Sequence, residues 1–256
     1  MNIIDEIKNF FTDLFCAPKR QNYQYQKNNN EKVSIFERGL NGKIDEPVYQ
    51  GENGNCWFVS GILSMSYVEN AAERFKNSMD IQKGGSAYMS FPGDNKVYRV
   101  SRSDMEKYNV PVSAKTSDYS RGDDDMLAAE LACEKRIADK NPKVNYSMQT
   151  GGNPYYVYKL YDAEDVAIPK TDDSFRKALD NAMNNPNSYA LSFGIVNKGI
   201  PGLKTGHSYA IKKVDNKTVT FVDPWDSTKE ITMSKSDFIK NQNNISLVYG
   251  RFDKQS

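Results

Sequence analysis

Residues 56–68 form a run that is apolar on almost every face of the helix that it would make. A helix that is apolar all round has no side to offer to water, so other elements must enclose it. Two further helices are expected at 126–139 and 174–184, where apolar residues recur at helical spacing. Asp123-Asp124-Asp125 suits the N-terminus of the first of these, and no other role is expected for it.

Strand-like patterns are concentrated in the second half of the chain. Extended segments are expected at 189–196, 207–214, 218–222 and 246–252, with shorter ones at 87–91 and 96–100. Antiparallel hairpins with the helices grouped elsewhere indicate an α+β fold, and there is no regular internal repeat. We expect a helical lobe over residues 45–165 and a β-rich lobe over residues 166–256.

Residues 1–44 are expected to form an N-terminal arm. Helical spacing of apolar residues predicts an amphipathic helix over 1–15, and a polar linker follows it. The pattern fits a docking helix on a tether, an inhibitory pro-segment or a membrane-surface anchor, and acidic residues on the polar face argue against the anchor. The basic pair Lys19-Arg20 before the core favours a removable or regulatory arm.

Composition excludes several classes of protein. The 256 residues carry 34 Lys+Arg and 33 Asp+Glu, so the net field does not attract nucleic acid. No apolar run approaches the roughly 20 residues that span a bilayer, so no stable membrane insertion is expected. The chain begins with no secretion signal, and its three cysteines, Cys16, Cys56 and Cys133, have no metal-type spacing. We expect no disulfide framework, and a cytoplasmic protein or one exported without a signal peptide.

Cys56 is the first candidate for chemistry. It follows the turn Gly54-Asn55 and opens the predicted buried helix, where the helix dipole and free backbone N–H groups favour a thiolate. The alternative is a small core residue, as most free cysteines are. Gln50, six residues earlier, can offer its side-chain amide to an oxyanion together with the backbone N–H of Cys56.

His207 is the one histidine of the chain, and histidine is the usual general base near neutral pH. The segment that it opens turns at Asp215-Asn216 and returns along 218–222 to Asp223. Pairing around this turn places Asp223 within a residue or two of His207. A carboxylate there holds the imidazole in one tautomer and one orientation.

Several segments carry a family resemblance. They are Gln50-Gly51-Glu52-Asn53-Gly54-Asn55-Cys56-Trp57-Phe58, Leu131-Ala132-Cys133-Glu134-Lys135, Gly151-Gly152, Gly206-His207-Ser208-Tyr209 and Asp223-Pro224-Trp225-Asp226. Their order and separations resemble those of the calpain branch of the papain-like cysteine proteases, over roughly residues 45–250. The resemblance implies a two-lobe papain-like fold whose cleft binds an extended polypeptide and hydrolyses a peptide bond through a thioester.

The resemblance also implies a role for each matching residue. Cys56 would be the nucleophile and His207 the base and later the acid, with Asp223 in the place of the orienting asparagine. Gln50 would complete the oxyanion hole. Two tryptophans would support the site: Trp57 would start the packing of the central helix, and Trp225 would shield the His207–Asp223 pair from water.

Three positions depart from the family pattern. Asp223 replaces the usual asparagine, Asn55 an aspartate and Asp226 a glycine. Pro47 stands where calpain cores have a calcium-binding carboxylate, and the nearby Asp45, Glu46 and Glu134 are scattered oxygen donors. We therefore expect no cofactor, no metal and no dependence on calcium.

Two alternatives remain open at this point. A transglutaminase or deamidase uses a Cys-His-Asp triad and a thioester too, and Asp223 in place of asparagine favours that interpretation slightly. A catalytically silent binding module that keeps the fold is the second alternative, which the presence of Cys56, His207, Asp223 and Gln50 disfavours.

Overall fold

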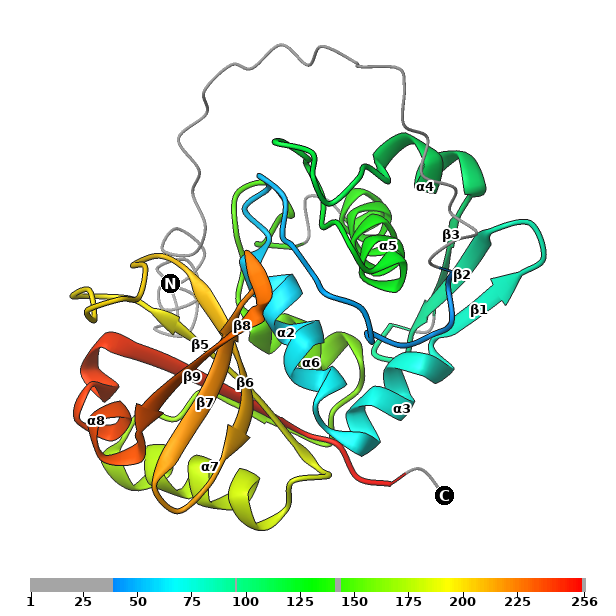
Figure 1. Ribbon diagram of the computed structural model, residues 1–256. Helices are drawn as coiled ribbons and strands as arrows, with labels where there is room; N and C mark the ends of the chain where they lie inside the picture. The colour runs from blue at the N-terminus through cyan, green and yellow to red at the C-terminus, as the bar shows by residue number, and fades with distance from the viewer. Residues whose placement is uncertain (1–38, 95, 141–143, 255–256) are drawn as a thin grey trace.

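A computed structural model describes residues 39–94, 96–140 and 144–254. The fold is α+β, as expected, with most helices in the first part of the chain and a large antiparallel sheet in the second (Figure 1). The helix predicted over 1–15 and most of the arm at 1–44 lie outside the described residues. Within those residues, no helix has the length and apolar character needed to cross a membrane.

The first part of the chain combines helices with a small sheet. Its helices are α2 (Cys56–Ser66), α3 (Glu69–Asn77), α4 (Arg102–Tyr108), α5 (Asp124–Lys140) and α6 (Pro154–Leu160). The small sheet is antiparallel, in the order β1 (Met79–Gln82), β2 (Ser86–Phe91) and β3 (Lys96–Val100). One face of it, which includes Met89 and Val100, is buried, and the sheet packs against α5.

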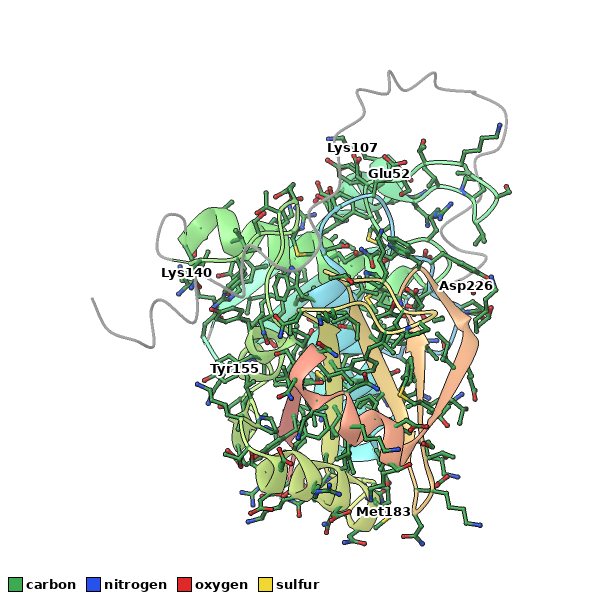
Figure 2. The ribbon with its side chains drawn as sticks, turned by 90° about the vertical axis from the view of Figure 1, so that its left-hand side faces the viewer. Glu52, Lys107, Lys140, Tyr155, Met183 and Asp226 are labelled. Atoms are coloured by element: carbon green, nitrogen blue, oxygen red, sulfur yellow. The ribbon has the colours of Figure 1, made fainter. Side chains whose placement is uncertain are left out.

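The second part is a six-stranded antiparallel sheet in the order β4-β9-β5-β6-β7-β8. Its strands are β4 (Asp165–Ala167), β5 (Tyr189–Ile195), β6 (Ser208–Val214), β7 (Thr218–Asp223), β8 (Asp226–Ser234) and β9 (Ile245–Arg251). Helices α7 (Asp172–Asn184) and α8 (Lys235–Lys240) cover one face, and the short 3-10 helix η2 (Gln242–Asn244) precedes β9. In Figure 2, Asp226 at the start of β8 and Met183 of α7 mark opposite ends of this sheet.

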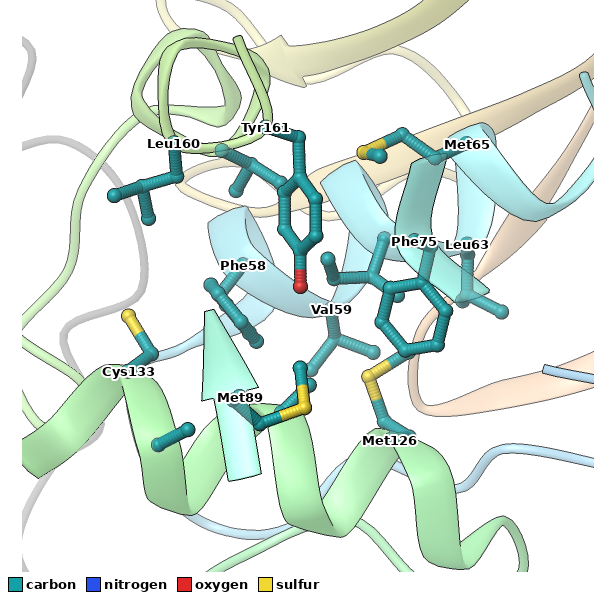
Figure 3. Close-up of a cluster of buried hydrophobic side chains, with 14 of the residues drawn as sticks. Phe58, Val59, Leu63, Met65, Phe75, Met89, Met126, Cys133, Leu160 and Tyr161 are labelled. Atoms are coloured by element: carbon teal, nitrogen blue, oxygen red, sulfur yellow. The ribbon is translucent and has the colours of Figure 1, made fainter. Parts of the chain in front are cut away.

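Helix α2 lies against the other face of this sheet and is buried from Cys56 to Met65, which confirms the predicted central helix. On its far side, Phe58, Val59 and Leu63 meet Met126 and other side chains of the helical part (Figure 3). The sheet has a separate apolar cluster on its α7–α8 face. Helix α2 joins the helical part to the other face of the sheet through one apolar cluster, which includes Ala190, Ala210 and Val222 of the sheet.

The buried side of α2 that meets the sheet is polar at two positions. The Oγ of Ser192 on β5 donates to the carbonyl oxygen of Ser60 at 3.1 Å, and lies 3.2 Å from the Oγ of Ser64. The hydroxyl of Tyr158 lies 2.8 Å from each of the Oγ atoms of Ser64 and Ser192. These hydroxyls are hydrogen-bond partners of one another, as buried polar groups require. They fix the position of α2 along its axis relative to the sheet.

The three aspartates at the start of α5 do more than the sequence analysis expected. The carboxylate of Asp125 accepts hydrogen bonds from the backbone N–H of Asn41 and Gly42, and that of Asp123 from the N–H of Asp45 and Glu46. The expectation of no other role is therefore wrong. These carboxylates are buried, and they tie residues 41–46 to the N-terminus of α5.

Candidate active site

The hairpin predicted around Asp215-Asn216 is present and brings a carboxylate to the histidine. Strand β6 begins directly after His207, β7 ends at Asp223, and Ala210 pairs with Val222. The Nε2 of His207 lies 2.8 Å from the Oδ1 of Asp223. The predicted proximity of these two side chains is confirmed.

Two aromatic rings enclose the imidazole of His207, whose side chain is only 3% exposed. The ring of Tyr209 meets it edge-on at a centroid distance of 5.0 Å, and the indole of Trp225 lies over it at 4.7 Å. The same Oδ1 of Asp223 also accepts the backbone N–H of Trp225 at 2.8 Å. One carboxylate thus fixes both the imidazole and the segment that carries the covering indole.

Gln50 reaches the same place from the other part of the chain. Its backbone N–H donates to the carbonyl oxygen of Pro224 at 2.8 Å, between Asp223 and Trp225. Two further hydrogen bonds join Val48 to Ser227. The Gln50 side chain is buried and donates from Nε2 to the carbonyl oxygen of Asn53 at 3.1 Å, while its Oε1 accepts no hydrogen bond from the described part of the chain. The second N–H of this amide is the group that an oxyanion would require.

Cys56 is the first residue of α2, and this end of the helix lies near the start of β6 (Figure 1). Ser60 contacts Ser192, which pairs with Ala210 on β6. Cys56 is one turn before Ser60, about 6 Å along the axis. His207 is three residues before Ala210, about 10 Å along the strand. Both lie beyond the Ser60–Ser192 contact, toward the edge where Gln50 meets Pro224.

The sulfur of Cys56 is disulfide-bonded in this structure and the residue is fully buried, whereas Cys133 is free and buried. This state differs from the expectation of no disulfide framework. A sulfur in a disulfide is not a thiolate and cannot attack a carbonyl carbon. Chemistry at Cys56 therefore requires its reduction first.

Trp57 lies away from the imidazole and anchors the start of α2. Its Nε1 donates to the carbonyl oxygen of Ser147 at 3.2 Å, and its ring lies 5.1 Å from that of Tyr146. A Cβ on Gly152 would stand 2.6 Å from the indole, so only glycine fits there. This placement agrees with the packing role that the sequence analysis gave to Trp57.

Glu130 is a residue near the site that sequence reasoning missed. It is fully buried in α5 and accepts hydrogen bonds from the Nδ2 of Asn55 and from the N–H and hydroxyl of Ser120. Asn55 directly precedes Cys56, and its carbonyl oxygen accepts the N–H groups of Phe58 and Val59. A glutamate at an inward position of an amphipathic helix was the available signal, because buried carboxylates are rare without a partner.

Two of the three carboxylates that were considered as calcium ligands, Asp45 and Glu134, have protein partners. Asp45 accepts from the Nδ2 of Asn41, and Glu134 from the hydroxyl of Tyr119 and the Nε2 of Gln149. Among residues 39–94, 96–140 and 144–254, no group of three or more His, Cys, Asp or Glu side chains is arranged to hold a metal ion.

A comparison of the chain with protein-family models finds no match, and a comparison with curated proteins finds none either.

The first prediction concerns the tautomer of His207. Because Asp223 faces Nε2, the neutral imidazole should carry its proton there and leave Nδ1 as the basic nitrogen. As the only histidine, His207 gives a single pair of ring-nitrogen NMR signals in which the two tautomers are distinguishable. Asp223→Asn, which keeps an oxygen acceptor, should preserve the preference, and Asp223→Ala should abolish it. A neutral wild-type ring protonated on Nδ1 would contradict this geometry.

The second prediction concerns the pH dependence of stability. Burial raises the pKa of Glu130 to about 8, above the ordinary value of about 4.3 expected in the unfolded chain. The folded protein therefore holds this proton over a pH range in which the unfolded chain has lost it. Between about pH 4.5 and 8, the free energy of unfolding should fall as pH rises.

Glu130→Gln should flatten this fall, as measured by urea unfolding at pH 5 and pH 8. The exposed Glu106→Gln is the matched control and should leave the slope unchanged. Other titrating groups are common to the proteins and cancel in the comparison. Parallel pH profiles for wild type and Glu130→Gln would show that this carboxyl group titrates alike in both states.

Proposed function

We propose that this protein is a cysteine endopeptidase with a papain-like two-lobe fold and a Cys56-His207-Asp223 triad. The observation that carries the proposal is the 2.8 Å contact between His207 Nε2 and Asp223 Oδ1. This contact lies at the end of the sheet near which α2 begins with Cys56. An oriented imidazole next to the first residue of a buried helix is the arrangement that activates a thiol. The resemblance to the calpain branch supports the same assignment.

In the proposed reaction, His207 accepts the proton of the reduced Cys56 thiol, and the resulting thiolate attacks the carbonyl carbon of the scissile bond. The side-chain amide of Gln50 and the backbone N–H of Cys56 stabilise the oxyanion. His207, protonated, gives its proton to the leaving amine, and the C–N bond breaks to leave a thioester on Cys56. His207 then takes a proton from water, which attacks the thioester and releases the carboxylic acid.

Asp223 has two functions in this scheme. Its negative charge stabilises the imidazolium that forms beside it, more strongly than a neutral asparagine would. Its second hydrogen bond, to the N–H of Trp225, keeps the indole over the ring and water away from the His207–Asp223 contact. The same charged partner favours the second candidate function, acyl transfer or deamidation at glutamine side chains, because those reactions use the same triad and thioester.

The third prediction is the outcome of a digest of casein and of a peptide library by the reduced full-length protein. Wild type should produce new peptide ends, and Cys56→Ala and His207→Ala should lower the rate at least 1,000-fold, roughly the effect of losing a triad member. Cys133→Ala is the matched control, because that thiol is buried away from His207, and it should retain activity. Omission of the reductant should suppress cleavage, and a calcium chelator should not.

The outcomes separate the candidate functions. New peptide ends identify a protease, and release of ammonia from glutamine substrates without new ends identifies a deamidase. The absence of both reactions with reduced wild-type protein would leave the silent binding module and would contradict the proposal.

A further inference from the structure

The surface next to His207 carries an exposed aromatic ring and a lysine that makes no salt bridge within the described residues. Trp225 is 44% exposed, although it covers an almost completely buried imidazole. The Nζ of Lys204 lies 3.6 Å from the centroid of the indole, well inside the range of a cation–π interaction. The centroid distance from indole to imidazole is 4.7 Å, so the ammonium group lies within about 8 Å of the imidazole.

The backbone of Lys204 is held by contacts with the same site. Its backbone N–H donates to the hydroxyl of Tyr209 at 2.7 Å, and Tyr209 packs against His207. The N–H of Gly206 donates to the carbonyl oxygen of Ile195 at 2.8 Å, which holds the end of the loop on the sheet. The backbone that carries Lys204 is therefore held by the scaffold, and the cation–π contact places its ammonium group on the indole.

Two lysines of the sheet have carboxylate partners that Lys204 lacks within the described residues. Lys229 pairs with Asp226 at 2.7 Å and Lys212 with Glu230 at 2.5 Å, whereas Lys204 makes no salt bridge within the described residues. Burial of part of its side chain lowers the pKa of Lys204, with Asp223 acting in the opposite direction. No carboxylate of the described residues lies within salt-bridge distance of the Lys204 Nζ, and the residue is exposed, so a carboxylate from outside would find an accessible cation.

The mechanism decides on which side of the scissile bond such a carboxylate would lie. His207 protonates the leaving amine, so the chain that follows this amine runs beside the imidazole and the groups stacked on it. An extended chain advances about 3.3–3.6 Å per residue, so the first two residues after the scissile bond reach the Trp225–Lys204 surface.

We propose that Lys204 and Trp225 form a subsite for an acidic side chain in the first two residues after the cleaved bond. This inference rests on the proposed protease function and narrows its substrate class to polypeptides that carry Asp or Glu directly after the cleavage site. Lys204 acts as a specificity residue: its ammonium group pairs with the carboxylate, while the indole contacts the aliphatic part of the substrate side chain.

The fourth prediction uses pairs of C-terminally amidated peptides that differ only by Glu or Gln at either of these two positions. Wild type should have a kcat/KM about 3- to 5-fold higher for the Glu peptides, the size expected for a partly exposed ion pair. The preference should shrink as ionic strength rises. Lys204→Met should remove it, Lys204→Glu should reverse it toward Lys peptides, and Lys204→Arg should retain it. Lys198→Met, in the same loop, is the matched control and should keep the preference.

Each outcome bears on the inference. Cleavage of Glu and Gln peptides at equal rates would overturn the subsite and leave the protease proposal intact. No cleavage of either peptide by reduced wild type would overturn both. A preference that appears only with a free C-terminal carboxylate, and is lost on amidation, would assign the cation to a chain end and overturn the side-chain subsite.

Discussion

The burial of α2 between the six-stranded sheet and the helical part of the chain is the constraint on which the remaining structure depends. The helix can be enclosed on all sides because its polar atoms find partners there: Ser60 and Ser64 bond to Ser192 and Tyr158. These contacts fix the position of α2 along its axis, and they bring its N-terminal end to the end of the sheet where β6 starts and β7 ends. This packing places Cys56 and His207, which are 151 positions apart in the sequence, at the same end of the sheet.

A second constraint is the backbone link between the segment before α2 and the segment after β7. Hydrogen bonds from Gln50 to Pro224 and between Val48 and Ser227 close this edge. Asp223 stabilises the same region, because its carboxylate contacts His207 and accepts a hydrogen bond from the N–H of Trp225. Removal of this carboxylate would therefore disturb the orientation of the imidazole, the position of the indole and the surface to which Lys204 is attached.

The sequence predicted the parts of the fold that have strong periodic or local signals. The continuous apolar run predicted α2. The Asp215-Asn216 turn between two alternating segments predicted the β6–β7 hairpin and its His207–Asp223 contact. Strand β8 was missed because it is an edge strand whose residues are half-buried or exposed, so it lacks an apolar face. Asp123, Asp125 and Glu130 were missed as structural residues because each has a partner in a loop far along the chain, at a separation that a linear pattern does not encode. The contact between the ammonium group of Lys204 and the indole of Trp225 was not predicted for the same reason, because neither the residue types nor their spacing indicates it.

The central claim is that the reduced sulfur of Cys56 and the imidazole of His207 act as a pair. Its most direct test is the alkylation rate of each cysteine in the reduced full-length protein near neutral pH, measured by peptide mass spectrometry for wild type and His207→Ala. The account predicts that Cys56 reacts faster than Cys16 and Cys133 in wild type and loses this advantage in the variant. Equal rates at Cys56 in the two proteins, or a wild-type Cys56 that reacts more slowly than Cys16, would contradict it.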